Sequence, residues 1–238
     1  MRLDKYLSEA GVLTRSESAR AVRSGKIAVN GETVKSPSVH IDENTAVVYC
    51  CGKRVVWKRF VYIMLNKPAG YVSSTDDREN TVMELLPESS LRMGMFPCGR
   101  LDKDTTGLLL VTNDGPLAHE LLSPSKHVEK TYAFETVDAV TDEMIKALNE
   151  GVDIGHHVSR SEKVILTGKN TGEITVTEGK FHQIKRMFHG VGTEILKLER
   201  ISFGPLVLDR NLSPGEWRYL SEEEEKALLR AGGRDTDK

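Results

Sequence analysis

The sequence of 238 residues has few cysteines and no apolar run long enough to cross a membrane. Its three cysteines are Cys50, Cys51 and Cys98. They match no disulfide framework and no paired metal-ligand spacing, so we expect reduced structural thiols. A membrane helix needs about 20 consecutive apolar residues, and the N-terminal segment MRLDKYLSEAG lacks the apolar core of a signal peptide. We therefore expect a cytoplasmic protein with no membrane partner.

Signatures of common cofactor machinery are also missing. The sequence has no Gly-x-x-x-x-Gly-Lys-Ser/Thr loop, no Gly-x-Gly-x-x-Gly turn, no Gly-x-Ser-x-Gly elbow and no His-Glu-x-x-His pair. The seven histidines are scattered, and the adjacent pair His156-His157 would point to opposite sides of an extended segment. No metal site is predicted from them.

Charge is unevenly distributed along the chain, although the net charge is only -2. Residues 1–59 carry 11 Lys and Arg against 6 Asp and Glu, which gives +5. Residues 60–238 carry 22 against 29, which gives -7. With 39% hydrophobic and 29% charged residues, the chain can bury a core in one or two domains. A basic N-terminal module thus precedes a mildly acidic body.

The basic module is predicted to contain two short helices followed by a small sheet. Apolar residues at helical spacing predict a helix over 3–10, and a capping box at Thr14-x-x-Glu17 opens a second over 14–25. The outward face of the second helix carries Arg15, Arg20 and Arg23. Strands are predicted over 27–29, 32–34, 46–49 and 55–57, the first two joined by the hairpin turn Asn30-Gly31.

A larger α+β domain is predicted to follow a boundary near residue 60 and to run to residue 238. Strands are expected over 62–65, 71–73, 108–112, 131–136, 173–177 and 194–198, and helices over 81–86, 141–150 and 181–191 and from Pro116. These elements do not alternate regularly, which favours a mixed, mainly antiparallel sheet with flanking helices over a doubly wound sheet. The acidic tail over 222–238 is expected to fray.

Three segments combine residue types that carry chemistry. Residues 99–110, GRLDKDTTGLLL, run from charged residues straight into a buried strand, where a carboxylate can be held at a cleft. An isolated Asp there is more often a loop cap. In EKTY (129–132) a Tyr begins a strand, and alone it is more often a core residue. In EGKFHQIKRMF (178–188) an apolar helical stripe leaves Lys185 and Arg186 projecting elsewhere, as in any packed helix with a solvated basic face.

Taken together, these segments resemble the RNA pseudouridine synthases, and residues 64–77, MLNKPAGYVSSTDD, add to the resemblance. The ending Leu208-Asp-x-x-Leu-x-Pro-Gly-Glu216 is similar to the small-subunit pseudouridine synthase A branch of that family. Residues 1–59 resemble the S4-like RNA-binding domain that precedes the catalytic domain in this branch. One departure is Phe181, where the branch often has Tyr.

The resemblance implies that the protein isomerises uridine to pseudouridine in ribosomal RNA without a cofactor. By motif match, Asp102 would be the nucleophile or would start proton abstraction. Tyr132 would stack against the flipped base, and Lys185 would pair with Asp102 and keep it ionised. Three routes stay open at this point: an adduct at C6, an acylal at C1′, or a glycal.

The resemblance also implies two sets of RNA contacts. The residues expected around the substrate nucleotide are Arg100, Thr106, Phe181, His182, Gln183 and Arg186. The residues expected to supply phosphate contacts from the basic module are Arg2, Arg15, Arg20, Arg23 and Lys26. The expected partner is 16S rRNA, free or in a partly assembled small subunit, and the expected oligomeric state is a monomer.

Other functions fit the same residues. A ribosome-assembly factor would keep the fold and bind rRNA without chemistry, although the set Asp102, Tyr132 and Lys185 argues against it. A hydrolase would break the same glycosidic bond and release uracil. A synthase of the same family acting on 23S rRNA is a further alternative, because the sequence does not identify the target uridine.

Overall fold

The chain forms two compact units in the computed structural model, which describes residues 1–155 and 157–234. Unit 1 comprises Met1–Val61 together with Leu86–Phe96, and unit 2 comprises Tyr62–Leu85 and the chain from Pro97 onward. Residues 86–96 belong to unit 1 although the residues on either side of them in sequence belong to unit 2. The sequence did not predict this, because the composition of residues 86–96 does not differ from that of the surrounding sequence. The domain boundary near residue 60 stays a prediction.

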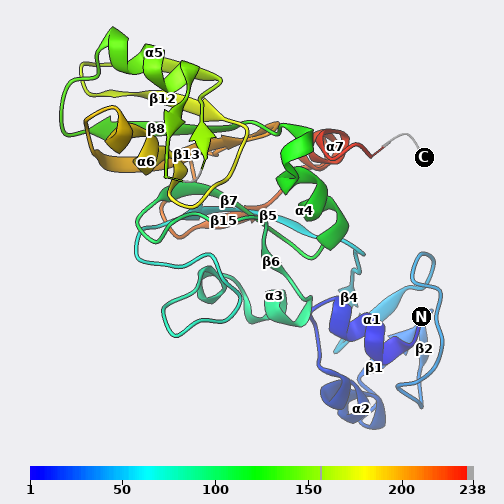
Figure 1. Cartoon of the computed structure of the whole chain (residues 1–238). Helices are drawn as coiled ribbons and strands as arrows, with labels where there is room; N and C mark the ends of the chain where they lie inside the picture. Colours follow the sequence, from blue (N-terminus) through cyan, green and yellow to red (C-terminus); the bar gives the residue numbers. More distant parts are fainter. Residues whose placement is uncertain (156, 235–238) are drawn as a thin grey trace. The chain divides into compact units, whose positions relative to one another are not determined.

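Unit 1 has three helices and a four-stranded antiparallel sheet (Figure 1). Its elements are α1 (Leu3–Glu9), α2 (Arg15–Arg23), β1 (Ile27–Val29), β2 (Glu32–Thr33), β3 (Val48–Cys50), β4 (Lys53–Val55) and α3 (Glu88–Arg92), with strand order β2-β1-β3-β4. The predicted capping box opens α2, because Thr14 Oγ1 accepts from the Glu17 amide and the Glu17 carboxylate accepts from the Thr14 amide. Apolar side chains from α1, α2 and the sheet share one core.

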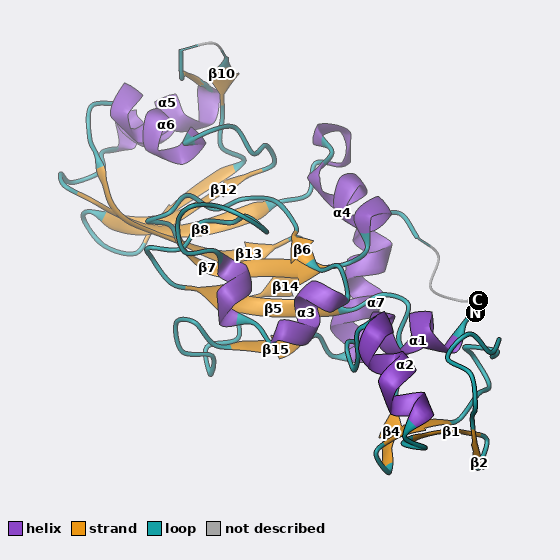
Figure 2. Cartoon of the chain, turned by 90° about the horizontal axis from the view of Figure 1, so that it is seen from below, coloured by secondary structure: helices purple, strands orange, loops and turns teal. Residues whose placement is uncertain are grey.

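Unit 2 is built on a nine-stranded mixed sheet (Figure 2). Along the main order its strands are β11 (Lys163–Leu166), β12 (Thr171–Val176), β8 (Lys130–Thr136), β13 (Ile195–Phe203), β7 (Thr106–Thr112), β5 (Tyr62–Lys67) and β15 (Trp217–Tyr219); β14 (Leu206–Val207) pairs with β13 and β6 (Phe96–Pro97) with β7. Only β7 and β13 pair in parallel along the main order. The prediction of a mixed, mainly antiparallel sheet is confirmed.

The parallel pairing of β7 with β13 depends on a glycine. Gly107 has a φ of +96°, which L side chains rarely adopt, and a Cβ added there would lie 2.3 Å from the carbonyl oxygen of Arg200. The glycine therefore allows β13 to approach the start of β7 closely. Leu108–Val111 follow it as a fully buried run at the centre of the sheet.

Helices flank the sheet in two groups (Figures 1 and 2). The helices α5 (Asp142–Glu150) and α6 (Gln183–Gly190) lie together near β8 and β12, while α4 (Gly115–Leu122) and α7 (Glu222–Ala231) lie together elsewhere on the unit. Two 3₁₀ turns, Val82–Leu85 and Pro124–Lys126, and a hairpin of β9 (Val152–Asp153) with β10 (Val158–Ser159) complete the unit.

Three local predictions need correction. Residues 71–73 form no strand and contribute only an isolated bridge from Val72 to Thr81. The helix expected over 81–86 is a single 3₁₀ turn. The tail expected to fray forms α7 over residues 222–231, because Ser221 and Glu224 build a capping box and Leu228 is buried. Residues 235–238 of that tail lie outside the described residues.

Within the described ranges, every helix is too short or too polar to cross a membrane.

Candidate active site

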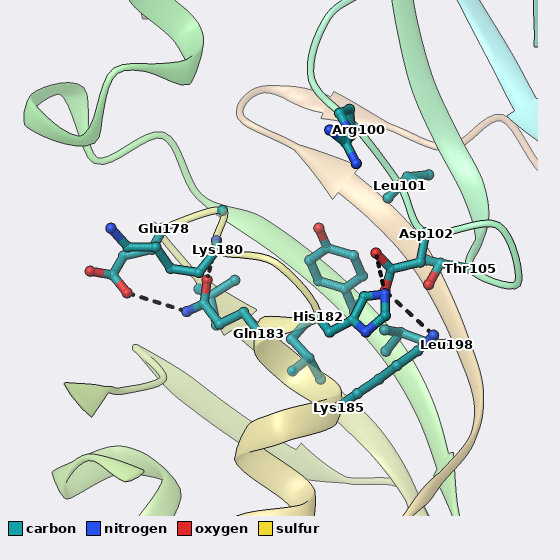
Figure 3. Close-up of a pocket in the computed structure, with 14 residues that line it drawn as sticks. Arg100, Leu101, Asp102, Thr105, Glu178, Lys180, His182, Gln183, Lys185 and Leu198 are labelled. Carbon is teal, nitrogen blue, oxygen red and sulfur yellow. Dashed lines mark hydrogen bonds and ion pairs between the residues drawn. The ribbon is translucent and has the colours of Figure 1, made fainter. Parts of the chain in front are cut away.

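The three segments singled out from the sequence meet in one pocket of unit 2 (Figure 3). The loop before β7 supplies Arg100, Leu101, Asp102 and Thr105; β8 supplies Tyr132; β12 and the following loop supply Val176, Glu178, Gly179 and Lys180; the start of α6 supplies His182, Gln183, Ile184 and Lys185; and β13 supplies Leu198. The sheet order explains this convergence, because β12, β8, β13 and β7 are consecutive neighbours.

Asp102 faces two basic groups of the α6 segment (Figure 3). Its Oδ2 lies 3.4 Å from the Nζ of Lys185, and its Oδ1 lies 3.7 Å from the Nε2 of His182. The Asp102 side chain is 25% exposed and that of Lys185 is 23% exposed, so both groups are accessible from the pocket and partly shielded from water. A carboxylate in this position has a cation beside it and free access to a substrate.

Lys185 also binds a second carboxylate, Asp104, which the sequence analysis did not single out. The Nζ of Lys185 donates to Oδ1 of Asp104 at 2.5 Å, a shorter contact than the one to Asp102. Burial by itself would raise the pKa of Asp104, but the hydrogen bond and charge of Lys185 outweigh it and hold that pKa below its ordinary value. The only signal in the sequence was the spacing Asp-x-Asp within GRLDKDTTG.

Lys67, at the end of β5, holds the loop that carries Asp102. Its side chain is fully buried, and its Nζ donates to the carbonyl oxygens of Pro68, Asp102, Lys103 and Thr105 at 2.8–3.2 Å. Burial lowers the pKa of this ammonium to about 8, although the charges of Asp104 and Asp102 oppose the shift. The segment MLNKPAG was part of the resemblance, yet no role was predicted for its lysine.

Tyr132 lines the pocket from β8 and is 9% exposed. In the sheet it lies opposite Ile174 of β12 and Arg200 of β13. Leu198, two residues before Arg200 on β13, also lines the pocket and is buried. The pocket therefore has a phenol ring and an aliphatic side chain among its walls, next to a carboxylate, which suits a flat ring such as a uracil.

His182 has an unusual backbone conformation at the start of α6. It is the N-cap residue, with a left-handed φ of 50°, and such values in a residue other than glycine are uncommon and gather at functional sites. Its ring stacks on that of Phe181, with centroids 3.8 Å apart and planes inclined by 19°. Phe181 itself is 61% exposed, and the guanidinium of Arg186 lies 5.2 Å from its ring centroid.

Not all residues predicted around the substrate line the pocket. Arg100, His182 and Gln183 do, whereas Thr106, Phe181 and Arg186 are not among the lining residues. Thr106 Oγ1 donates to the Leu198 carbonyl at 3.5 Å, and Arg186 donates to the carbonyl of Ile154 at 3.4 Å. The role of these residues in substrate contact stays a prediction.

Gln183 makes hydrogen bonds that connect residues of the pocket wall. Its Oε1 accepts from the amide of Lys180 at 3.0 Å, and its Nε2 donates to the carboxylate of Glu178 at 3.4 Å (Figure 3). Glu178 in turn accepts from Ser159 Oγ and contacts the His157 ring, which ties the β9–β10 hairpin to the pocket wall. Glu178 was within a segment singled out from the sequence, but its partners on the hairpin are distant in sequence.

The predicted phosphate contacts lie on the surface of unit 1. Arg15, Arg20, Arg23 and Lys26 are exposed, three of them on α2. Arg2 is exposed but forms an ion pair with Asp4 at 2.7 Å. Their binding of RNA stays a prediction. Among the described residues, no cluster of three or more His, Cys, Asp or Glu side chains is arranged to hold a metal ion.

Comparisons with known proteins identify the family to which each part of the chain is similar. Residues 61–190 match the RNA pseudouridylate synthase family, and residues 1–47 match the S4 domain. The chain is 44% identical over 230 residues to the uncharacterized RNA pseudouridine synthase YtzG of Bacillus subtilis, which covers 94% of this chain and 96% of that protein. It is 36% identical to the ribosomal small subunit pseudouridine synthase A of Haemophilus influenzae, covering 97% of this chain and 100% of that protein.

A solved structure is also similar to this chain over nearly its whole length. The crystal structure of a pseudouridylate synthase is 37% identical in sequence, with a TM-score of 0.67 over 96% of this chain and 99% of that one. The family match, the similarity over nearly the full length and the fold all point to the same family. The chain therefore belongs to the RNA pseudouridine synthase family and carries an S4 domain at its N-terminus.

Proposed function

We propose that the protein isomerises a uridine of 16S ribosomal RNA to pseudouridine, with Asp102 as the catalytic carboxylate. The observation that carries the proposal is the meeting of Asp102, Tyr132 and Lys185 in one pocket from segments far apart in sequence. Similarity over nearly the whole chain to proteins named ribosomal small subunit pseudouridine synthase A supports the choice of RNA.

The reaction breaks the bond between N1 of uracil and C1′ of ribose and forms a bond between C5 and C1′. C5 loses a proton and N1 gains one, so atoms balance without an external group. Asp102 acts as nucleophile or as the group that begins proton abstraction. The positive charge of Lys185, 3.4 Å from Asp102 Oδ2, stabilises the ionised carboxylate.

The remaining pocket residues hold the nucleotide during the reaction. A uridine inside an RNA must leave its stack to reach Asp102. Tyr132 and Leu198 supply flat and aliphatic surface that retains the detached uracil while it turns. Arg100, exposed at the edge of the pocket, contacts phosphate or occupies the place of the flipped base, and the ring of His182 meets the nucleotide from the α6 side.

The S4 domain supplies affinity for the RNA backbone. Affinity for nucleic acid comes largely from phosphate contacts, and the body carries a net charge of -7 whereas residues 1–59 carry +5. Exposed Arg15, Arg20, Arg23 and Lys26, together with Arg2, provide these contacts. We further propose that the protein acts as a monomer in the cytoplasm, on free rRNA or on a partly assembled subunit.

Carbodiimide mapping of rRNA from cells with and without this protein tests the proposal. Carbodiimide marks pseudouridine, so one position in 16S rRNA loses its mark when the protein is absent. A lost mark in 23S rRNA instead overturns the choice of subunit. If no mark is lost, the protein is a binding factor, and if RNA treated with the pure protein loses the mass of a base, it is a hydrolase.

A further inference from the structure

The ammonium of Lys185 is shared unequally between two carboxylates. Its Nζ lies 2.5 Å from Oδ1 of Asp104 but 3.4 Å from Oδ2 of Asp102. The contact to Asp104 is a hydrogen bond. The contact to Asp102 is longer than the roughly 2.7–2.9 Å of a charge-assisted N–H···O bond, so it is a charge contact beyond the usual hydrogen-bond range. The closest partner of the pocket cation is therefore not the proposed catalytic group.

The spacing of the two carboxylates is fixed by the main chain. The amide of Thr105 donates to the carbonyl of Asp102 at 3.1 Å, which closes a turn over residues 102–105. The Nζ of Lys67 donates hydrogen bonds to the carbonyl oxygens of Asp102, Lys103 and Thr105 in this turn. Because the turn is held at three carbonyls, the position of Asp104 relative to Asp102 is set by the fold.

Lys185 is constrained from its own side as well. It is the third residue of α6, and its side chain is 23% exposed, whereas that of Asp104 is 73% exposed. Asp104 therefore reaches from the surface of the turn toward a half-buried cation. The other titratable groups around this cation are Asp102, His182 and the buried Lys67.

A strong hydrogen bond to a carboxylate stabilises its charge and weakens it as a nucleophile or base. We propose that Asp104 is a positioning residue: it holds the ammonium of Lys185 so that the cation stabilises Asp102 by charge without a short hydrogen bond to it. This inference rests on the proposed function and names a group that acts through Lys185. Without Asp104, Lys185 moves onto Asp102 and occupies the oxygen that must react.

The test measures tritium release from rRNA that was labelled at C5 of uridine in cells lacking the protein. We expect Asp104→Asn to lower kcat about tenfold while leaving KM for RNA within about twofold, because the loss is confined to the chemical step. Asp104→Glu, which restores the negative charge, is expected to recover part of kcat. The matched control is Glu79→Gln, which removes an exposed carboxylate that binds Lys103 of the same turn and leaves both constants unchanged.

A double-mutant cycle with Lys185→Met shows whether Asp104 acts through the lysine. We expect Asp104→Asn to have no further effect in the Lys185→Met background, because its partner is gone. Independent, additive losses would overturn the inference, as would an effect confined to KM or none at all. If Asp102→Asn is inactive while Asp104→Asn matches the wild type, only the inference fails; if Asp102→Asn stays active, the proposed function fails first.

Discussion

Replacement of Lys67 by methionine tests whether the turn around Asp102 depends on one buried cation. Methionine has an unbranched side chain one atom shorter than that of lysine and lacks the group that donates to four carbonyl oxygens. Pro68 is half-buried and Lys103 is exposed, so water reaches their carbonyls in the variant. Thr105 is 2% exposed and its carbonyl, 2.8 Å from Nζ, loses its donor inside the protein.

The magnitude follows from these contacts. A buried acceptor left without a donor costs about 1–3 kcal/mol. Of the four hydrogen bonds, the one to the Thr105 carbonyl is buried and the other three are partly buried. Part of this cost is offset because the variant no longer buries an ammonium. We expect the free energy of unfolding to fall by about 2–3 kcal/mol and Tm by roughly 5–10 °C for a chain of this size.

The assay combines urea unfolding with tritium release from C5-labelled uridine in rRNA. We expect Lys67→Met to reduce kcat by more than about tenfold even at a temperature where the variant is fully folded, because Asp102 loses its fixed position. Lys130→Met is the control: that buried lysine donates to the carbonyls of Val128 and Thr177, outside the turn. It should lose stability and keep kcat. Equal kcat in the folded Lys67 variant and wild type would refute the reasoning.

Three further predictions concern charge. Lys185→Met should lower kcat about a hundredfold, because Asp102 loses the neighbouring cation, and near-normal turnover would mean that this lysine belongs to a solvated face. Burial lowers the pKa of the two buried lysines, Lys67 and Lys130, to about 8 in the folded protein, from the ordinary value of 10.5. Between these two pH values the unfolded chain binds more protons than the folded chain, so the free energy of unfolding should rise with pH. Urea titrations at pH 8 and 9.5 measure this rise, and the double Lys→Met variant should lack it. Replacing the three α2 arginines, Arg15, Arg20 and Arg23, by alanine should make the slope of log affinity against log salt shallower by about 2 to 3, and an unchanged slope would place the phosphate contacts elsewhere.

The three segments of the proposed site were singled out from the sequence because each is a continuous motif next to a regular element. Asp102, Tyr132 and Lys185 were assigned through motif resemblance, and the strand order then brings their elements together. The capping box at Thr14 was predicted for a similar reason, since all of its contacts are local. A structure whose contacts all lie within one segment can be predicted before the fold is known.

The rest of the site depends on contacts between segments far apart in sequence. Lys67 lies 35 residues before Asp102, and Asp104 lies 81 residues before Lys185, so neither pairing has a local signature. The same reason explains the error at the C-terminal tail. Four consecutive Glu suggested fraying, but Arg218 binds Glu224 and Asp209 and fixes the start of α7.

The measurement that tests the central claim most directly is tritium release by Asp102→Asn compared with wild type. The amide keeps the size of the side chain but is neither a nucleophile nor a base at this position. The account predicts release below about one per cent of the wild-type rate, with RNA affinity within about tenfold, because the phosphate contacts are separate from the chemistry. Release at a rate near that of the wild type would contradict the assignment of Asp102 as the catalytic carboxylate.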